Sequence, residues 1–118
     1  MVNNLVREAL ERLYDGVCTI TVKESYKDNG VTRLKDTIYC DNQKCRLSYQ
    51  STSASDESNT VSTSYQIIKL FIAPEIEIPE GAKIEVTQNG RTETYKRSSK
   101  PMVYSNHQEV ILDRLEKT

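Results

Sequence analysis

His107 is the only histidine in the 118-residue sequence, so any mechanism that needs an imidazole depends on it. It lies in "SNHQEV", at the start of a strand-like segment, which indicates a structural or surface role. Glu75, Glu77 and Glu80 could supply paired carboxylates for hydrolysis, although an exposed acidic turn explains them with fewer assumptions. The sequence has no GxSxG, HExxH, phosphate-loop or dinucleotide motif. We therefore expect a protein that is not an enzyme and uses no cofactor.

The three cysteines are Cys18, Cys40 and Cys45. We expect small, partly buried thiols in reduced surroundings. A disulfide between Cys40 and Cys45 across "CDNQKC" would need an oxidising setting. A zinc site made of the three cysteines and His107 would lack the closely spaced ligand pairs of a zinc module, so no metal is expected.

A basic cluster beside a tyrosine is a candidate docking hairpin. It comprises Arg91, Tyr95, Lys96, Arg97 and Lys100, mostly within "TYKRSSK". Small barrels bind single-stranded nucleic acid with such side chains, and a solvated hairpin tip or a contact to an acidic neighbour is the alternative. The formal net charge of the chain is −1, so no general positive field draws it to nucleic acid or to an anionic membrane.

An amphipathic helix is expected within residues 1–16. Asn3 and Asn4 can cap its start, and Gly16 stands where a left-handed terminating residue is expected. The apolar face would consist of Leu5, Val6, Ala9, Leu10 and Leu13. Because a helix this short is not stable alone in water, its leucines must dock on the chain's own sheet or on a neighbouring subunit.

From residue 17 the apolar period changes to two, which is typical of strands. A tight turn at "KDNG" and a second turn at "DNQ" (41–43) would delimit the first strands. The inner residues expected here are Cys18, Ile20 and Val22, followed on the return by Leu34, Ile38 and Cys40.

The most apolar segment is "YQIIKLFIAP". Its apolar residues occupy both alternation sets, so we expect a strand that is covered on both faces. Turns are expected at 79–81 and at "NG" (89–90). The inward residues of the last strands would be Ile84, Val86, Val110 and Leu112.

The predicted fold is mainly β: a small antiparallel β-barrel with a short N-terminal amphipathic helix and one long polar inter-strand loop. We expect a single domain over 1–118, with the helix in 1–16, the barrel in 17–50 and 65–118, and a flexible loop at 51–64. No stretch approaches the roughly 20 apolar residues of a membrane span, and no signal peptide is evident.

The segment "IPEGAKIEVTQNGRTETYKRSSKPMVYSNHQEVILD" resembles the C-terminal half of head-closure proteins of long-tailed bacteriophages. These are stopper-like head–tail connector proteins, and the likeness is to versions encoded by defective prophage elements of Bacillus-type bacteria. The matching residues are Gly81, Ile84, Asn89, Gly90 and Tyr95. Ala82 departs from the acidic residue usual in the family, and 92–94 lengthens the return strand.

The resemblance implies a virion-assembly protein whose subunits form a homo-oligomeric ring below the portal and adaptor rings. Such a ring closes the DNA channel and docks the tail. It implies a place in the virion neck, after synthesis in the bacterial cytoplasm, near DNA but without sequence-specific binding, and no contact with a membrane. The alternatives left open are a single-strand nucleic-acid-binding barrel and another neck or tail-completion component.

The resemblance also gives a role to the polar stretch 51–64, where nine of fourteen residues are Ser or Thr. Loops longer than about 12–15 residues are usually functional or disordered. In the family, a long loop at this position points into the channel. The candidate channel-loop residues are Ser51, Thr52, Ser53, Ala54, Ser55, Asp56, Glu57, Ser58, Asn59, Thr60, Val61, Ser62, Thr63 and Ser64.

Overall fold

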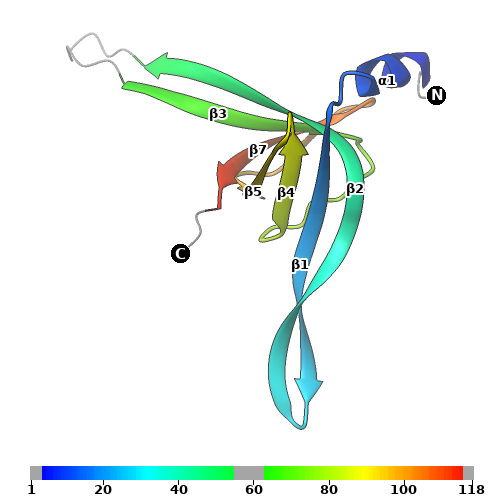
Figure 1. Ribbon diagram of the computed structural model, residues 1–118, viewed down its shortest axis with the longest axis vertical. Coiled ribbons are helices and arrows are strands. Elements are labelled where there is room, and N and C mark those ends of the chain that lie inside the picture. Colours follow the sequence, from blue (N-terminus) through cyan, green and yellow to red (C-terminus); the bar gives the residue numbers. More distant parts are fainter. Residues whose placement is uncertain (1–3, 55–62, 116–118) are drawn as a thin grey trace.

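The computed structural model describes residues 4–54 and 63–115, and within them the chain is mainly β with one short helix, as predicted (Figure 1). All of the strand pairs are antiparallel. The elements are α1 (Asn4–Glu11), β1 (Gly16–Asp28), β2 (Val31–Ala54), β3 (Thr63–Ile72), β4 (Lys83–Gln88), β5 (Arg91–Arg97), β6 (Met102–Val103) and β7 (Gln108–Arg114).

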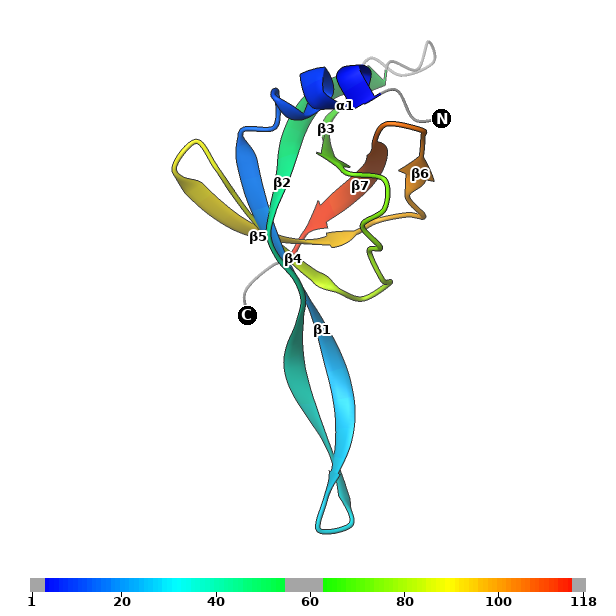
Figure 2. The ribbon, with the colours of Figure 1, turned by 90° about the vertical axis from the view of Figure 1, so that its right-hand side faces the viewer.

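The sheet curls into a barrel-like ring. Its strand order is β3-β2-β1-β4-β5-β7, and β3 also pairs with β7, so six of the described strands close on themselves. The short strand β6 pairs with the start of β7, while β5 pairs with the end of β7. Figure 2 shows the closed part of the sheet above a long hairpin formed by β1 and β2.

The core consists of alternating residues from these strands. Ile20, Ile84, Leu70 and Val110 are fully buried, and each such side chain contributes about 1.5–3 kcal/mol when it leaves water. The alternation predicted for the first strand and for the last strands is confirmed. The outer set of "YQIIKLFIAP" is less covered than predicted, since Phe71 is only half-buried.

The turn predicted at 41–43 is wrong. The strand β2 runs through this point, with Asn42 at a φ of 52°. Cys18 pairs with Gln43 while Ile20 pairs with Cys40, so β2 carries an extra residue against β1. A β-bulge of this kind bends and twists a strand, which lets one strand pass from the barrel into the projecting hairpin.

The inward positions predicted for Leu34 and Ile38 are also wrong, since their side chains are 66% and 61% exposed. The strand β4 pairs with β1 only at 17–21, and beyond this point the described parts of β1 and β2 pair only with each other. Both faces of this hairpin therefore meet solvent. The predicted turn at its tip is confirmed, with Asn29 and Gly30 at positive φ.

The helix is shorter than predicted, and two of the leucines expected to dock are exposed, while Leu10 is half-buried. It ends at Glu11, and Gly16 starts β1 instead of terminating the helix. The side chains of Leu5 and Leu13 are 77% and 57% exposed. Tyr14, which follows the helix, is buried.

The polar stretch enters the sheet from both sides. Residues 51–54 extend β2 and 63–64 extend β3, with Ser51 paired to Gln66 and Ala54 to Thr63. The remaining candidate loop residues, 55–62, lie outside the described part of the chain.

The side chain of Gln88 forms hydrogen bonds with the backbone of β2 at Leu47, just past the point where the pairing of β2 with β1 ends. The Leu47 amide donates to Oε1 of Gln88 at 2.8 Å, and Nε2 of Gln88 donates to the Leu47 carbonyl at 3.2 Å. Gly16 leaves room for this side chain, because a Cβ there would lie 2.9 Å from Oε1 of Gln88 and 3.2 Å from the Cys45 carbonyl oxygen. The local chain therefore needs a glycine for space.

We predict that Gly16→Ala lowers the free energy of unfolding by about 1–3 kcal/mol, because the new methyl group displaces the Gln88 amide from Leu47. Urea denaturation measures the change. Gln88→Ala is the matched background, and the cost of Gly16→Ala should shrink in it. Costs that simply add in the double variant would contradict this interpretation.

We predict that Tyr14→Phe leaves the protein equally stable or stabilises it by about 1 kcal/mol. The Tyr14 hydroxyl is buried and has no hydrogen-bond partner among the described residues, and burial raises the pKa of this phenol to about 12. Tyr14→Ala, which removes the ring, should cost about 3–5 kcal/mol. Thermal melting of both variants checks this, and a marked loss of stability in Tyr14→Phe would reveal a missed hydroxyl partner.

Candidate interaction surfaces

The most prominent surface is the projecting hairpin of residues 22–38, here called the β1–β2 arm (Figure 1). The molecule measures 61 × 42 × 29 Å and has a radius of gyration of 17.4 Å. A compact chain of this length would have a radius of about 13–14 Å. The excess reflects elements such as the arm, which extend away from the core.

Cross-strand contacts stiffen the arm. The guanidinium of Arg33 lies 3.2 Å from the Asp28 carboxylate, and Nζ of Lys35 lies 5.7 Å from the ring centroid of Tyr26. Lys27, Arg33 and Lys35 outnumber Asp28 over 27–35, so the tip of the arm is basic. An isolated two-stranded hairpin is marginally stable in water, and contacts like these favour one register.

Apolar side chains remain on the arm surface. They are Tyr26, Val31, Leu34 and Ile38. Leu34 shares one face with Ser25, while Val31 is paired with Asp28 on the other face. Because no core lies beneath these apolar side chains, the arm is a candidate contact surface.

The second surface is a shallow groove of about 460 Å3 between the β3–β4 connection and the segment that leads into β6. We call it the β6 groove. Its apolar lining residues include Pro74, Ile76, Pro79, Pro101 and Val103. Val103 is 63% exposed, and carboxylates of the β3–β4 connection stand at the rim.

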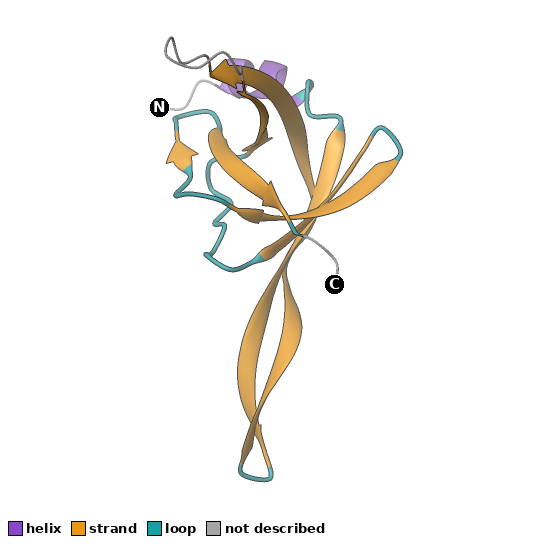
Figure 3. Ribbon diagram, turned by 90° about the vertical axis from the view of Figure 1, so that its left-hand side faces the viewer, coloured by secondary structure: helices purple, strands orange, loops and turns teal. Residues whose placement is uncertain are grey.

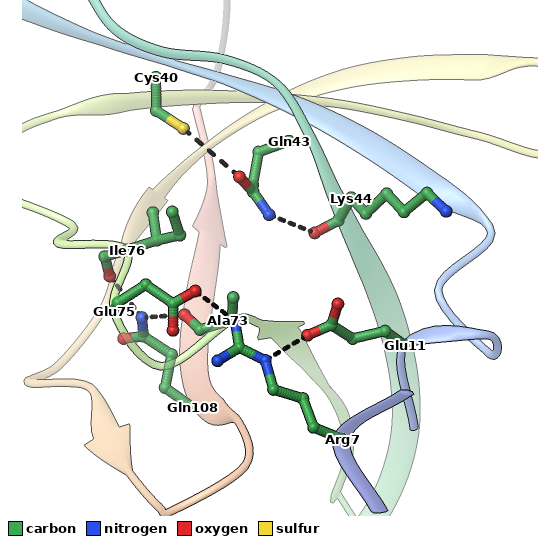
Figure 4. Close-up of polar contacts among 9 residues, drawn as sticks. All are labelled: Arg7, Glu11, Cys40, Gln43, Lys44, Ala73, Glu75, Ile76 and Gln108. Carbon is green, nitrogen blue, oxygen red and sulfur yellow. Dashed lines mark hydrogen bonds and ion pairs between the residues drawn. The ribbon is translucent and has the colours of Figure 1, made fainter. Parts of the chain in front are cut away.

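A buried glutamine holds one wall of the β6 groove. Nε2 of Gln108 donates to the Ala73 carbonyl at 2.8 Å and also to the Ile76 carbonyl (Figure 4). Sequence reasoning missed this residue, although Gln108 lies in the same alternation phase as the inward residues of β7. A polar side chain in an inward phase predicts a backbone partner.

The helix is tied to the same wall. The Arg7 guanidinium contacts Glu11 at 2.7 Å and also pairs with Glu75 of the β3–β4 connection (Figure 4). The hydrogen bond from Arg7 lowers the pKa of Glu75. Nη1 of Arg46 donates to the Leu13 carbonyl at 3.2 Å. Glu75, predicted to lie in an exposed acidic turn, is thus exposed but paired.

The other two glutamates of this turn are less constrained. Glu77 accepts a hydrogen bond of 3.0 Å from the Tyr39 hydroxyl, and the Glu80 carboxylate lies 3.7 Å from Arg97. Both are exposed at the rim of the β6 groove. The three glutamates do not form a buried acid pair.

His107 packs beneath the segment that carries β6. Its ring stacks on Tyr104, with centroids 4.9 Å apart, and on Phe71 at 6.0 Å. Nε2 of His107 lies 2.9 Å from Glu109, whose carboxylate also pairs with Lys69 at 3.1 Å. These contacts position the chain around β6.

The cysteines lie elsewhere in the barrel. Cys18 and Cys45 are buried and Cys40 is half-buried, all as free thiols. Contact with Cys45 and burial raise the pKa of the Cys18 thiol. The described residues include no group of three His, Cys, Asp or Glu side chains that could hold a metal ion.

The structure does not gather the predicted basic hairpin into one patch. Tyr95 is fully buried, with its hydroxyl 2.6 Å from Glu93 and 3.3 Å from the Tyr49 hydroxyl. No face of its ring is open to a nucleic-acid base. Arg91 lies at one end of β5, whereas Lys96, Arg97 and Lys100 lie at or beyond the other end.

Figure 3 shows the arm and the barrel as strands, and the β3–β4 and β5–β6 connections, which contribute most residues of the β6 groove, as loops. Among the described residues, no helix is long and apolar enough to cross a membrane.

Comparison with known proteins supports the fold. No protein-family model matches the chain, and no curated protein matches it. The chain is similar to the solved structure of the phage-like element PBSX protein xkdH from Bacillus subtilis, with a TM-score of 0.52 and 14% identity. The match covers 83% of this chain and 91% of that chain.

We predict that acidification lowers the free energy of unfolding of the wild-type protein more than that of the Glu109→Gln variant. The hydrogen bond from His107 and the ion pair with Lys69 hold the pKa of Glu109 below its ordinary value. A lowered pKa in the folded state adds stability that is complete above the unfolded-state pKa of about 4.3 and is lost as pH falls through the folded-state pKa.

Urea midpoints at about pH 6 and about pH 3 measure this difference. Glu85→Gln, at an exposed position of β4, is the matched control and should keep the full acid sensitivity of the wild type. An equal loss of stability in Glu109→Gln and in the wild type would show that this carboxylate does not contribute to the pH dependence.

Proposed function

We propose that this chain is a structural protein of a phage-type particle, a head–tail connector subunit that forms a ring below the portal or adaptor. In that position the ring would close the DNA channel and dock the tail. The observation that carries the proposal is the fold shared, over most of both chains, with a protein of a phage-like element. The resemblance of residues 78–113 to head-closure proteins supports the finer assignment.

The form of the molecule supports an assembly role. The barrel provides a rigid body, and the β1–β2 arm and the β2–β3 hairpin extend from it in different directions (Figure 1). Exposed apolar residues on the arm and on β6 are the kind of surface that assembly proteins bury against neighbours. A monomeric protein gains nothing from keeping both surfaces uncovered.

The net charge of the chain is compatible with a position near DNA without tight binding to it. A net charge of −1 provides no dense row of cations to neutralise phosphates. A channel-facing role for 51–64 stays a prediction, since 55–62 lie outside the described residues. Burial of Tyr95 removes the aromatic platform on which the single-strand nucleic-acid alternative depends.

We predict that the purified full-length chain self-associates into closed rings. Native mass spectrometry would give one dominant stoichiometry, and negative-stain electron microscopy would show annular particles with a central opening. A chain that stays monomeric at every accessible concentration would overturn the ring proposal. Salt-dependent binding of a fluorescent oligonucleotide by the monomer would instead favour the single-strand alternative.

A further inference from the structure

We infer that the β1–β2 arm of one subunit lies in the β6 groove of a second copy of this chain. The inference rests on the proposed function, because it names the two surfaces through which neighbouring ring subunits would touch.

The first step is that the arm carries apolar surface that its own molecule does not cover. Val31 and Leu34 sit near the tip, on opposite faces of the ribbon. Charged residues occupy both strands of the arm, including Lys23 and Asp36, which discourages edge-to-edge strand pairing. A contact through side chains therefore fits the arm better than the addition of another strand.

The second step is that the β6 groove offers a matching surface. Its lining combines proline rings with Ile76 and the exposed Val103, and it has the volume of a small binding site. Gln108 fixes the β3–β4 wall through two backbone carbonyls, and Glu75 of that wall is held by Arg7. A wall anchored in this way is preformed for a partner.

The third step is electrostatic. Lys27, Arg33 and Lys35 make the arm tip basic. Glu77 and Glu80 stand exposed on the β3–β4 wall of the groove, while Arg97 and Lys100 line the groove from the other side, with Arg97 3.7 Å from Glu80. The arm tip and the carboxylates of the β3–β4 wall therefore carry opposite charge, which favours a contact between the tip and this wall in one register. The phosphates of DNA would also be attracted to the basic residues of the tip. Phosphates gain nothing from Val31 or Leu34, however, so a protein surface fits the tip better.

The fourth step is geometric. The arm points away from the barrel, and the β6 groove lies on the barrel itself, so the tip does not reach the groove of its own molecule (Figure 2). A contact between two different surfaces of identical chains is heterologous. Contacts of this type close into rings when the rotation between neighbours allows it.

The experiment exchanges the charges of the two surfaces. One variant reverses the arm tip (K27E/R33E/K35E), and a second reverses the groove rim (E77K/E80K). Each variant alone would place like charges together, and we expect it to need about tenfold or more protein for half-assembly in native mass spectrometry at about 0.15 M salt. An equimolar mixture should assemble again, because each arm then meets a groove of opposite charge.

The matched control is K44E/K83E/K96E, which reverses three exposed lysines on barrel strands and changes the net charge as much as the arm variant. It should assemble like the wild type. Thermal melting of every variant shows whether the barrel is folded. Rings that persist in both reversed variants would overturn the arm contact and leave the proposed function standing. A mixture that fails to restore assembly would also overturn the contact.

A second measurement does not depend on charge. A photo-crosslinking residue in place of Leu34 should attach to residues 74–80 or 97–103 of another copy, as located by mass spectrometry of the digested product. Attachment to a different region of the chain, or to added DNA, would overturn the proposal. A wild-type chain that never assembles would remove the proposed function as well, so the two failures are distinguishable.

Discussion

The twenty-four residues of β2 connect both the β1–β2 arm and the β2–β3 hairpin to the barrel. The strand pairs with β1 along the arm and in the barrel, and with β3 from Cys45 onward. Just past the last residue of β2 that β1 pairs with, Gln88 hydrogen-bonds to the backbone amide and carbonyl of Leu47. The bulges near Asn42 bend the strand without breaking it. One continuous backbone can therefore serve a closed core and a long ribbon.

The pairing of β3 with β7 closes the ring of strands that β2 helps to form. Ile68 to Ile72 pair with the first residues of β7, which brings two distant segments of the chain into one core. Once the barrel is closed, the connections around it are held by polar side chains. Gln108 fixes the β3–β4 connection from inside, and Arg7 fixes it from the helix. The β6 groove is the result of these two anchors.

The proposed roles of the arm and the β6 groove follow from what the fold leaves uncovered. Buried groups in this barrel are largely apolar and closely packed, so they explain stability and not contact with other molecules. The arm places Leu34 and basic residues away from any core, and the groove presents Val103 together with the exposed carboxylates of Glu77 and Glu80. Together they would give a subunit two unlike surfaces, as the proposed ring requires.

The amino-acid sequence determined the local parts of this structure. Asn and Gly tolerate positive φ, so the turns at 29–30 and 89–90 were predictable, and alternation identified the inward residues of β4 and β7. The tertiary structure alone decided where strands leave the barrel. Leu34 follows the same alternation as a core residue, yet it is 66% exposed, because alternation reports which residues share a face and not whether another element packs on that face. The same reason explains why Tyr95, expected near a binding surface, is buried, and why Gln88 and Gln108 found partners more than thirty residues away.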